Sequence, residues 1–255
     1  TYPVYYDWWL QDGQDAKNEK DGKDVNWFRG TLSRQLSMRL QKLNVTTTVN
    51  DTPESITAAF QAYLKACEAR RAKRLASFTA NSPEIVFTKF RTLRPSFFAY
   101  TEGASDARAE CNYIAGGTLS KIKMNGIWAE EETLMTDEDG VYRDPNLHFD
   151  GQHLLFSWKK SAKEDDFHLY EMDLKTRDIK QLTFGKGHAD IEGIYLPDEN
   201  ILFNSTRCGS AVDCWFTEVS NMYLCDREGR YMRQVGFDQV HTVTPTLLDD
   251  GRIVY

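Results

Sequence analysis

The chain has 255 residues, 41% of them hydrophobic, which is enough for one large domain or two smaller ones. A net charge of −7 and an isoelectric point near 5.3 argue against a nucleic-acid-binding protein and against one that binds anionic membrane surfaces. No stretch approaches the roughly 18 consecutive apolar residues of a membrane-spanning helix, so no span is predicted. The sequence begins at Thr1 with no secretory signal before it, as expected of a processed or trimmed chain.

Two helices are predicted after an aromatic head. Residues 1–23 combine Tyr and Trp side chains with a polar stretch, and these rings either pack onto the body or form a carbohydrate-stacking strip. Residues 24–43 place apolar side chains at steps of three and four, which predicts an amphipathic helix. A second helix is predicted to begin at Thr52 and Pro53, because a hydroxyl cap followed by proline favours a helix start.

A β-rich region is predicted over residues 84–255, after a small helical region over residues 1–83. Within it one pattern recurs: a turn signal is followed by short runs rich in Leu, Ile, Val, Phe and Tyr. Two copies are nearly complete, and a third begins shortly before Tyr255. The turn signals that open the three copies are Asp150-Gly151, Asp198-Glu199 and Asp250-Gly251.

The spacing of these copies predicts the fold. Phe156 and Phe203 are 47 residues apart, and Tyr170 and Tyr223 are 53 apart. A period of roughly 40 to 50 residues with several short strands is typical of a propeller blade. A lone four-stranded sheet cannot bury both of its faces, so each is expected to stack on a neighbour. The predicted fold class is therefore mainly β, a partial β-propeller with a small α-helical N-terminal region.

The first unit of this region is longer than the others. Glu84–Lys89 is predicted as its opening strand, with further strands at Phe97–Thr101 and Leu119–Met124 and an insertion within Glu102–Gly117. The region then holds about three and a half blades, whereas closed propellers have at least about four. We expect further blades or domains of the same protein, or a partner chain, to cover the edge left at Tyr255.

These residues carry a family resemblance. The runs LYEMDLKTRDIKQLTFG and MYLCDREGRYMRQVGF resemble the TolB-type propeller repeat, which implies an exported bacterial protein, periplasmic or extracellular. The runs RDPNLHFDGQHLLFSWKK and ILFNSTRC, with the residues that follow them, resemble proteins that contain the hydrazine synthase alpha-subunit middle domain. The resemblance covers about residues 84 to 255 and is specific for fold, because one propeller frame serves many chemistries.

The cysteines bear on cofactor and compartment. The sequence has five cysteines but no Cys-x-x-Cys-His, which argues against covalent c-type haem and so against the chemistry of hydrazine synthase. Cys208 and Cys214 are expected to form a disulfide if the chain is exported, and a thiolate metal site is the alternative. Trp215 and Phe216 next to them either pack in the core or form a wall against a sugar.

A candidate site is predicted where the innermost strands begin. His188 and His241 hold nearly equivalent places in successive repeats, and acidic side chains hold neighbouring places: Asp144, Asp190 and Glu192. Imidazoles and carboxylates that converge on a channel mouth suit a divalent metal ion or acid–base catalysis. The structural alternative is that the acids cap turns and the histidines bond to backbone.

Four further side chains are candidates with a structural alternative. Arg207 is predicted either to bind an anionic ligand or to pair with Asp213 or Glu218. His148 and His153 flank a turn, where solvent exposure is the expectation, and His168 is expected in a strand as a structural residue.

The sequence leads to a ligand-binding or scaffold propeller that acts with further domains, holding a small molecule or metal ion at the channel mouth. The alternative is an enzyme acting on polysaccharide, a lyase or hydrolase, with His188 or His241 as base or ligand and Arg207 neutralising a carboxylate. Haem-dependent nitrogen chemistry is a third hypothesis.

Overall fold

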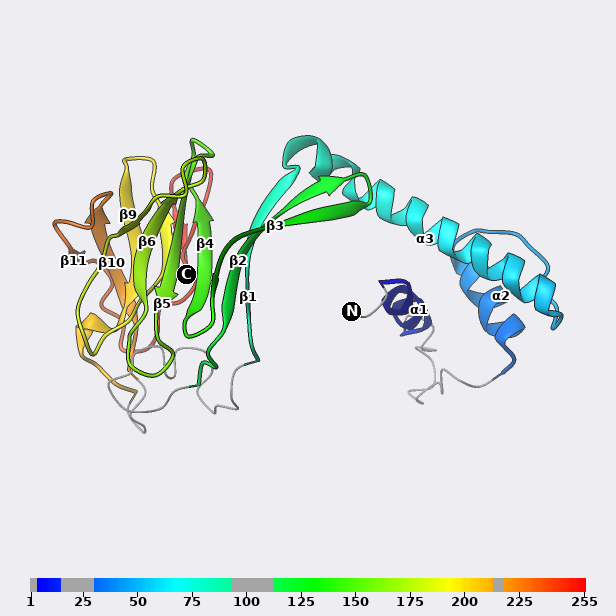
Figure 1. Ribbon diagram of the computed structural model, residues 1–255, viewed down its shortest axis with the longest axis horizontal. Coiled ribbons are helices and arrows are strands. Elements are labelled where there is room, and N and C mark those ends of the chain that lie inside the picture. Colours follow the sequence, from blue (N-terminus) through cyan, green and yellow to red (C-terminus); the bar gives the residue numbers. More distant parts are fainter. Residues whose placement is uncertain (1–3, 15–29, 93–111, 213–217) are drawn as a thin grey trace. The chain divides into compact units, whose positions relative to one another are not determined.

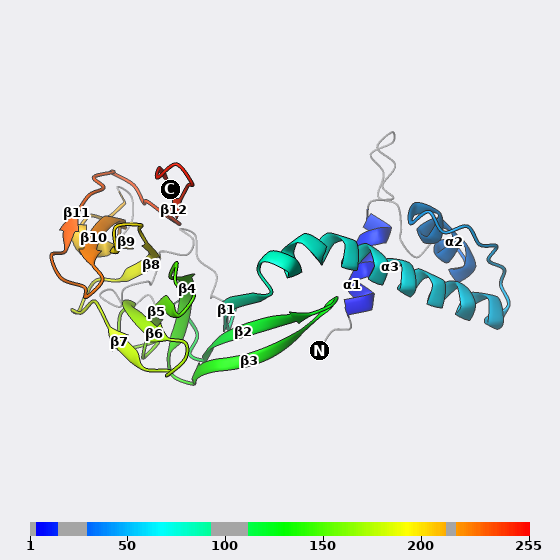
Figure 2. The ribbon, with the colours of Figure 1, turned by 90° about the horizontal axis from the view of Figure 1, so that it is seen from above.

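The computed structural model describes residues 4–14, 30–92, 112–212 and 218–255, shown as a ribbon in Figures 1 and 2. Their contacts group into two compact units. The helical unit comprises Thr1–Pro83 with Met124–Ala129, and the β-unit comprises Glu84–Lys123 with Glu130–Tyr255. That residues 1–83 and 84–255 are separate domains stays a prediction, because the tip of one β-hairpin groups with the helices.

The helical unit contains three helices: α1 (Val4–Gln14), α2 (Leu32–Lys42) and α3 (Pro53–Asn81). The predicted start of α3 is confirmed, since Thr52 Oγ1 accepts a hydrogen bond from the Ser55 N–H at 3.4 Å and Pro53 is the first helical residue. The helix predicted over 24–43 is confirmed for Leu32–Lys42, and residues 24–29 lie outside the described part. None of the helices described is long and apolar enough to cross a membrane.

Aromatic packing joins these helices. Tyr63 of α3 is fully buried, and the Trp9 ring of α1 lies edge-on to it with the ring centroids 5.4 Å apart. The Arg39 guanidinium lies 3.7 Å from the centroid of the Trp9 ring and donates to the Trp9 carbonyl at 3.1 Å. Trp8 is also buried. These two tryptophans therefore pack onto the helical unit, which was the first of the two interpretations of the aromatic head.

The β-unit consists of antiparallel sheets. The first sheet has the order β1 (Glu84–Phe90), β2 (Gly117–Asn125), β3 (Trp128–Asp137). The second has the order β4 (Val141–Leu147), β5 (His153–Lys159), β6 (His168–Asp173), β7 (Ile179–Gln181). The third has the order β8 (Asp190–Tyr195), β9 (Asn200–Ser205), β10 (Asn221–Asp226), β11 (Arg233–Gln234). The fourth pairs β12 (Thr246–Leu247) with β13 (Ile253–Val254).

The two four-stranded sheets are copies of one arrangement, as the repeat predicts. Figure 2 shows β4 and β8 beside each other inside the β-unit, with β7 and β11 at its outer edge. The predicted strands at Glu84–Lys89 and Leu119–Met124 are confirmed within β1 and β2. The predicted strand Phe97–Thr101 and most of the predicted insertion lie outside the described residues. The chain is therefore mainly β, with antiparallel sheets and an N-terminal helical region.

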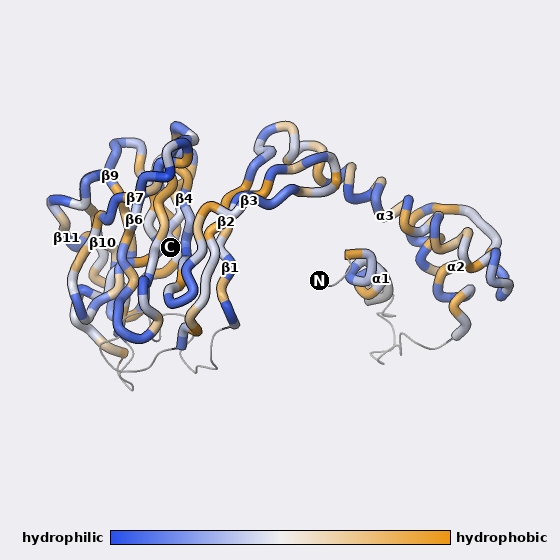
Figure 3. Tube along the Cα trace, in the orientation of Figure 1, coloured by the Kyte–Doolittle hydropathy of each residue, from blue (hydrophilic) through white to orange (hydrophobic). Residues whose placement is uncertain are grey.

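Successive sheets pack face to face, because the strands alternate their apolar side chains between two cores. On β5, Leu154 and Phe156 join a core with Leu119 of the first sheet. Leu155 points the other way and joins a core with Phe203 of the third sheet. Figure 3 shows hydrophobic segments along these strands and hydrophilic ones in most of the turns. The second sheet thus has both faces covered.

At Gly193 the second and third sheets approach each other closely. A Cβ added to it would lie 2.7 Å from Leu155 Cδ2 and 3.1 Å from Leu169 Cδ2. A larger side chain would force the Leu155 side chain, or the sheet that carries it, to shift, so the glycine serves packing here.

Candidate functional site

The innermost strands share an irregularity at equivalent places. The pairing register shifts between Arg143 and Asn146 in β4, and again between Ile191 and Ile194 in β8. Each shift contains an acidic residue with a left-handed backbone: Asp144 with φ 55° and Glu192 with φ 56°. Such bulges redirect a side chain out of the regular pleat.

The redirected carboxylates connect each sheet to the next. Asp144 Oδ2 accepts the Glu192 N–H at 3.1 Å, and Glu192 Oε2 accepts the Thr244 N–H at 2.5 Å. Thr244 is the corresponding residue before β12 and is also left-handed, with φ 47°. One bond therefore repeats from the second sheet to the third and from the third to the fourth.

Arg143 lies between these carboxylates. It is 8% exposed, and it donates from Nε to Asp144 Oδ2 at 2.6 Å and from Nη2 to Glu192 Oε1 at 3.1 Å. Its Nη1 donates to the Tyr113 hydroxyl at 2.7 Å. Burial lowers the pKa of Arg143, but Asp144 and the other acceptors around it raise that pKa overall. Glu192 also accepts from Asn204 Nδ2 at 2.8 Å.

Asp144 Oδ2 and both carboxylate oxygens of Glu192 therefore already accept hydrogen bonds from protein groups. Arg143 and Glu192 are buried and Asp144 is partly exposed, and hydrogen bonds and opposite charge compensate for removing such groups from water. A ligand could bind to these carboxylates only by replacing some of these hydrogen bonds. The assignment of both residues to ligand binding stays a prediction.

Asp190 and Arg207 form a second buried ion pair, where β8 begins and β9 ends. The Arg207 fork donates from Nε to Asp190 Oδ1 at 2.9 Å and from Nη2 to Asp190 Oδ2 at 2.7 Å. Ser205 Oγ donates to Oδ1 at 2.6 Å, and His168 Nδ1 lies 3.4 Å from Oδ2. Burial raises the pKa of the fully buried Asp190 carboxyl, but His168 and Arg207 lower that pKa overall.

The ion-pair partner that the structure describes for Arg207 is Asp190, which the sequence had not suggested. Asp213 lies outside the described residues, and the acceptor found is Asp190, 17 positions earlier in the chain. The pairing spans two strands of one sheet, so local sequence carries no signal for it. That Asp190 and Arg207 bind a ligand stays a prediction.

The two candidate metal-binding histidines have different surroundings. His188 Nε2 lies 3.3 Å from the Phe184 carbonyl oxygen, and its ring centroid is 6.3 Å from that of His168. His241 Nδ1 accepts the Ser220 N–H at 3.3 Å, and burial lowers the His241 pKa, so its imidazole is neutral at pH 7. Neither belongs to a group of three potential ligands within the described part, and their metal role stays a prediction.

The cysteine loop is described only in part. In the described part of the loop, Cys208 Sγ lies 3.1 Å from the Val219 carbonyl oxygen. Cys214, Trp215 and Phe216 lie outside the described residues. The disulfide and the sugar-binding wall therefore stay predictions.

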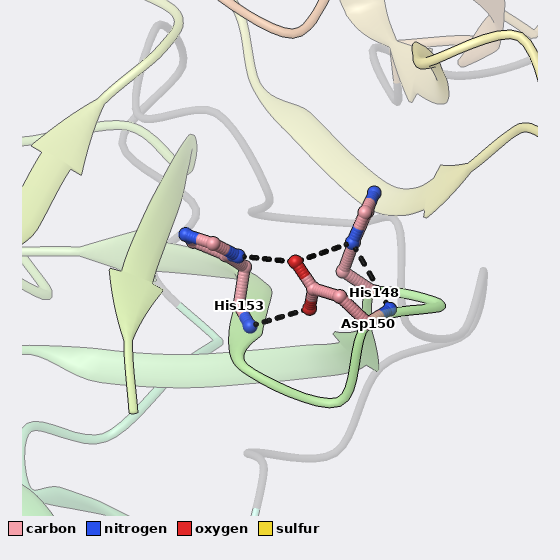
Figure 4. Close-up of side chains that lie close together, drawn as sticks. All are labelled: His148, Asp150 and His153. Atoms are coloured by element: carbon pink, nitrogen blue, oxygen red, sulfur yellow. Dashed lines mark hydrogen bonds and ion pairs between the residues drawn. The ribbon is translucent and has the colours of Figure 1, made fainter. Parts of the chain in front are cut away.

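A constellation that the sequence argument set aside is found at the turn between β4 and β5 (Figure 4). His148, Asp150 and His153 each offer a ligand atom, and these atoms all lie within 4.8 Å of one another. Asp150 Oδ2 lies 3.0 Å from His148 Nδ1 and 2.7 Å from His153 Nδ1. Burial raises the pKa of Asp150, but the Gln152 N–H and the two imidazoles lower that pKa overall.

Exposure was predicted for His148 and His153 because they flank a turn. His153 is partly exposed as expected, but His148 is only 6% exposed. Tyr195 of the third sheet covers it, with the ring centroids 4.6 Å apart. The spacing His-x-Asp-x-x-His across a predicted Asp-Gly hairpin turn was the signal available in the sequence.

The comparisons with known proteins concern the fold. No protein-family model matches the chain, and no curated protein is significantly similar to it in sequence. The structure is similar to hydrazine synthase from Kuenenia stuttgartiensis at 17% identity and a TM-score of 0.50, over 67% of this chain and 27% of that one. The predicted resemblance is thereby confirmed, as one of fold alone.

Two TolB structures are similar over a smaller part. TolB from Acinetobacter baumannii is 22% identical over 54% of this chain and 31% of its own, with a TM-score of 0.40. A putative TolB from Agrobacterium tumefaciens is 16% identical over 51% of this chain and 46% of its own, with a TM-score of 0.39. The chain spans less than half the length of each of these three proteins.

Proposed function

We propose that the β-unit is part of a β-propeller that serves as a binding or scaffold domain in a larger assembly, with further sheets completing the ring. The observation that carries this is the exposure of the fourth sheet. Tyr255 holds the repeat position of Phe156 and Phe203, which are both fully buried, yet Tyr255 is 57% exposed. Its neighbour Val254 is 54% exposed. Apolar side chains at a core position of the repeat call for a covering sheet.

The edge of the fourth sheet supports the same proposal. Among the described strands, β13 pairs only with β12, so its other edge presents backbone donors and acceptors without a strand partner. Such an edge is a template for another strand. The strands that would pair here come from more of the same protein or from a partner chain.

The binding role draws on a groove at one end of the innermost strands. It has a volume of about 480 Å³ and is lined by residues of the second, third and fourth sheets, which begin with β4, β8 and β12. Its lining includes Asn146, Leu147, Ile194, Tyr195, Pro245 and Leu247. A concave site with mixed apolar and polar walls suits a small molecule. His188 and Arg207 lie at the opposite end of β8, which places the groove away from the mouth that the sequence favoured.

The alternative function, an enzyme acting on polysaccharide, has less support from this geometry. It assigned Arg207 to a substrate carboxylate, but that guanidinium is already bidentate on Asp190. Export to the periplasm or the extracellular space is proposed on the resemblance to TolB-type proteins.

Amide hydrogen exchange tests the incomplete ring. In the monomeric 255-residue chain we expect the amides of β12 and β13 to exchange fast while those of β5 and β9 exchange slowly. In a longer natural form, or in the presence of a partner that completes the ring, the β12 and β13 amides should become slow. If the β12 and β13 amides of the monomer exchanged as slowly as those of β9, the fourth sheet would need no covering sheet and the proposal would be wrong.

A further inference from the structure

We propose that the turn between β4 and β5 binds a divalent transition-metal ion of the Zn²⁺ class through His148, Asp150 and His153. Two imidazoles and one carboxylate are a ligand set that Zn²⁺ takes in proteins, with a fourth position left for water or another ligand. The three side chains meet in Figure 4, where the Asp150 carboxylate lies between the two rings. This site is separate from the histidines and acids that the sequence argument placed at the channel mouth.

The backbone holds the two histidines at a fixed separation. The His148 N–H donates to the His153 carbonyl at 2.9 Å, and the Gly151 N–H donates to the His148 carbonyl at 2.9 Å. Gly151 has φ 69°, a left-handed conformation that glycine adopts without strain. The hairpin therefore presents both side chains from neighbouring strands, and their ring centroids are 6.0 Å apart.

The carboxylate is oriented with one oxygen toward the imidazoles. Asp150 Oδ1 accepts the Gln152 N–H at 2.7 Å and the His153 N–H at 3.2 Å. Oδ2 is the oxygen that lies between the two Nδ1 atoms. A metal ion at this point would replace those two contacts, together with the 3.3 Å contact from the Asp150 N–H to His148 Nδ1.

The far side of His148 supplies an independent observation. Its Nε2 is buried and makes no hydrogen bond to the residues that the structure describes, but Glu199 Oε2, on the turn between β8 and β9, lies 3.3 Å from it. Metal-binding histidines usually present their other ring nitrogen to a carboxylate, which fixes the tautomer and orients the ring. Arg227 Nη1 in turn contacts Glu199 Oε2 at 3.2 Å and holds that carboxylate in place. The turn thus has a ligand set, and a carboxylate lies within reach of the far ring nitrogen of His148.

Metal titration tests the proposal. Zn²⁺ affinity is measured on the full chain by competition with a chromophoric chelator, and the Co²⁺ absorption spectrum reports ligand geometry. We expect about one ion per chain. His153→Ala should weaken binding by at least about tenfold, His148→Ala similarly, and Glu199→Gln by about 10- to 100-fold.

The matched control for His153→Ala is His188→Ala, which removes one partly exposed imidazole elsewhere in the β-unit. It should leave the affinity unchanged. His153 is partly exposed, so its variant keeps the fold, which circular dichroism verifies. No binding in the parent chain, binding unchanged by His153→Ala, or binding lost in the control would each overturn the proposal. The result does not depend on whether further sheets complete the ring.

Discussion

Buried carboxylates recur in this chain, and each is held by partners from another element. Asp12, Asp190 and Glu192 are all at most 4% exposed. Removing a carboxylate from water is costly unless hydrogen bonds and opposite charge compensate for it. These residues therefore determine which elements can meet, because an incorrect pairing would leave a buried charge without partners.

Asp12 allows a test of this at the residue scale. Its carboxylate accepts the Arg70 fork at 2.6 and 3.0 Å and the Tyr63 hydroxyl at 2.7 Å, which ties α1 to α3. Burial raises the Asp12 pKa, but Arg70 and Tyr63 lower that pKa overall. A carboxyl group with a lowered folded-state pKa stabilises the fold above its unfolded pKa of about 3.9. That stabilisation is lost as the pH falls through the folded value.

We therefore expect α1 to detach as the pH falls below about 4, the unfolded-state pKa of an aspartate, measured by the tryptophan fluorescence of Trp8 and Trp9. Asp12→Asn should lose this acid transition and lower the free energy of unfolding at pH 7. Asp7→Asn is the matched control, because Asp7 is an exposed acid of the same helix. An acid transition that persists in Asp12→Asn would contradict the assignment.

At the scale of elements, the sequence predicted what local patterns determine. The hydroxyl and proline at the start of α3 and the alternating strands of the repeats were recognisable because the signal lies within a few neighbouring residues. The Asp144 and Glu192 contacts were not, because they join bulges 48 residues apart. The burial of His148 likewise depends on Tyr195 and Glu199, which belong to the next sheet.

Gly193 tests the packing of two elements. Gly193→Ala places a methyl group against Leu155, so we expect it to lower the free energy of unfolding by about 1 to 3 kcal/mol in urea titrations. Leu155→Ala alone should cost about 2 to 5 kcal/mol, because it leaves a cavity. The double variant should cost less than the sum, since each change relieves the other. Strict additivity would show that the two side chains do not meet.

At the scale of the whole β-unit, the sheets follow one another in chain order, and each contacts the next. In such an array, stability depends on each sheet and on each interface between sheets. The repeated bond from a bulge carboxylate to the next bulge N–H is one such interface contact. It links the fourth sheet to the rest of the array independently of side-chain burial.

Glu192 is where that link can be tested. Its carboxylate accepts a hydrogen bond from the Thr244 N–H, which immediately precedes the fourth sheet in the chain. It also accepts hydrogen bonds from Asn204 of the third sheet and Arg143 of the second. In Glu192→Ala the Thr244 N–H loses its acceptor. The free energy of local opening of the fourth sheet should therefore fall more than the free energy of global unfolding. Hydrogen exchange should therefore accelerate more at residues 244–254 than on β5. Glu228→Ala, an exposed acid of the same sheet, should leave both rates unchanged. Equal acceleration everywhere in Glu192→Ala would mean that the carboxylate supports the unit as a whole and does not specifically connect the fourth sheet.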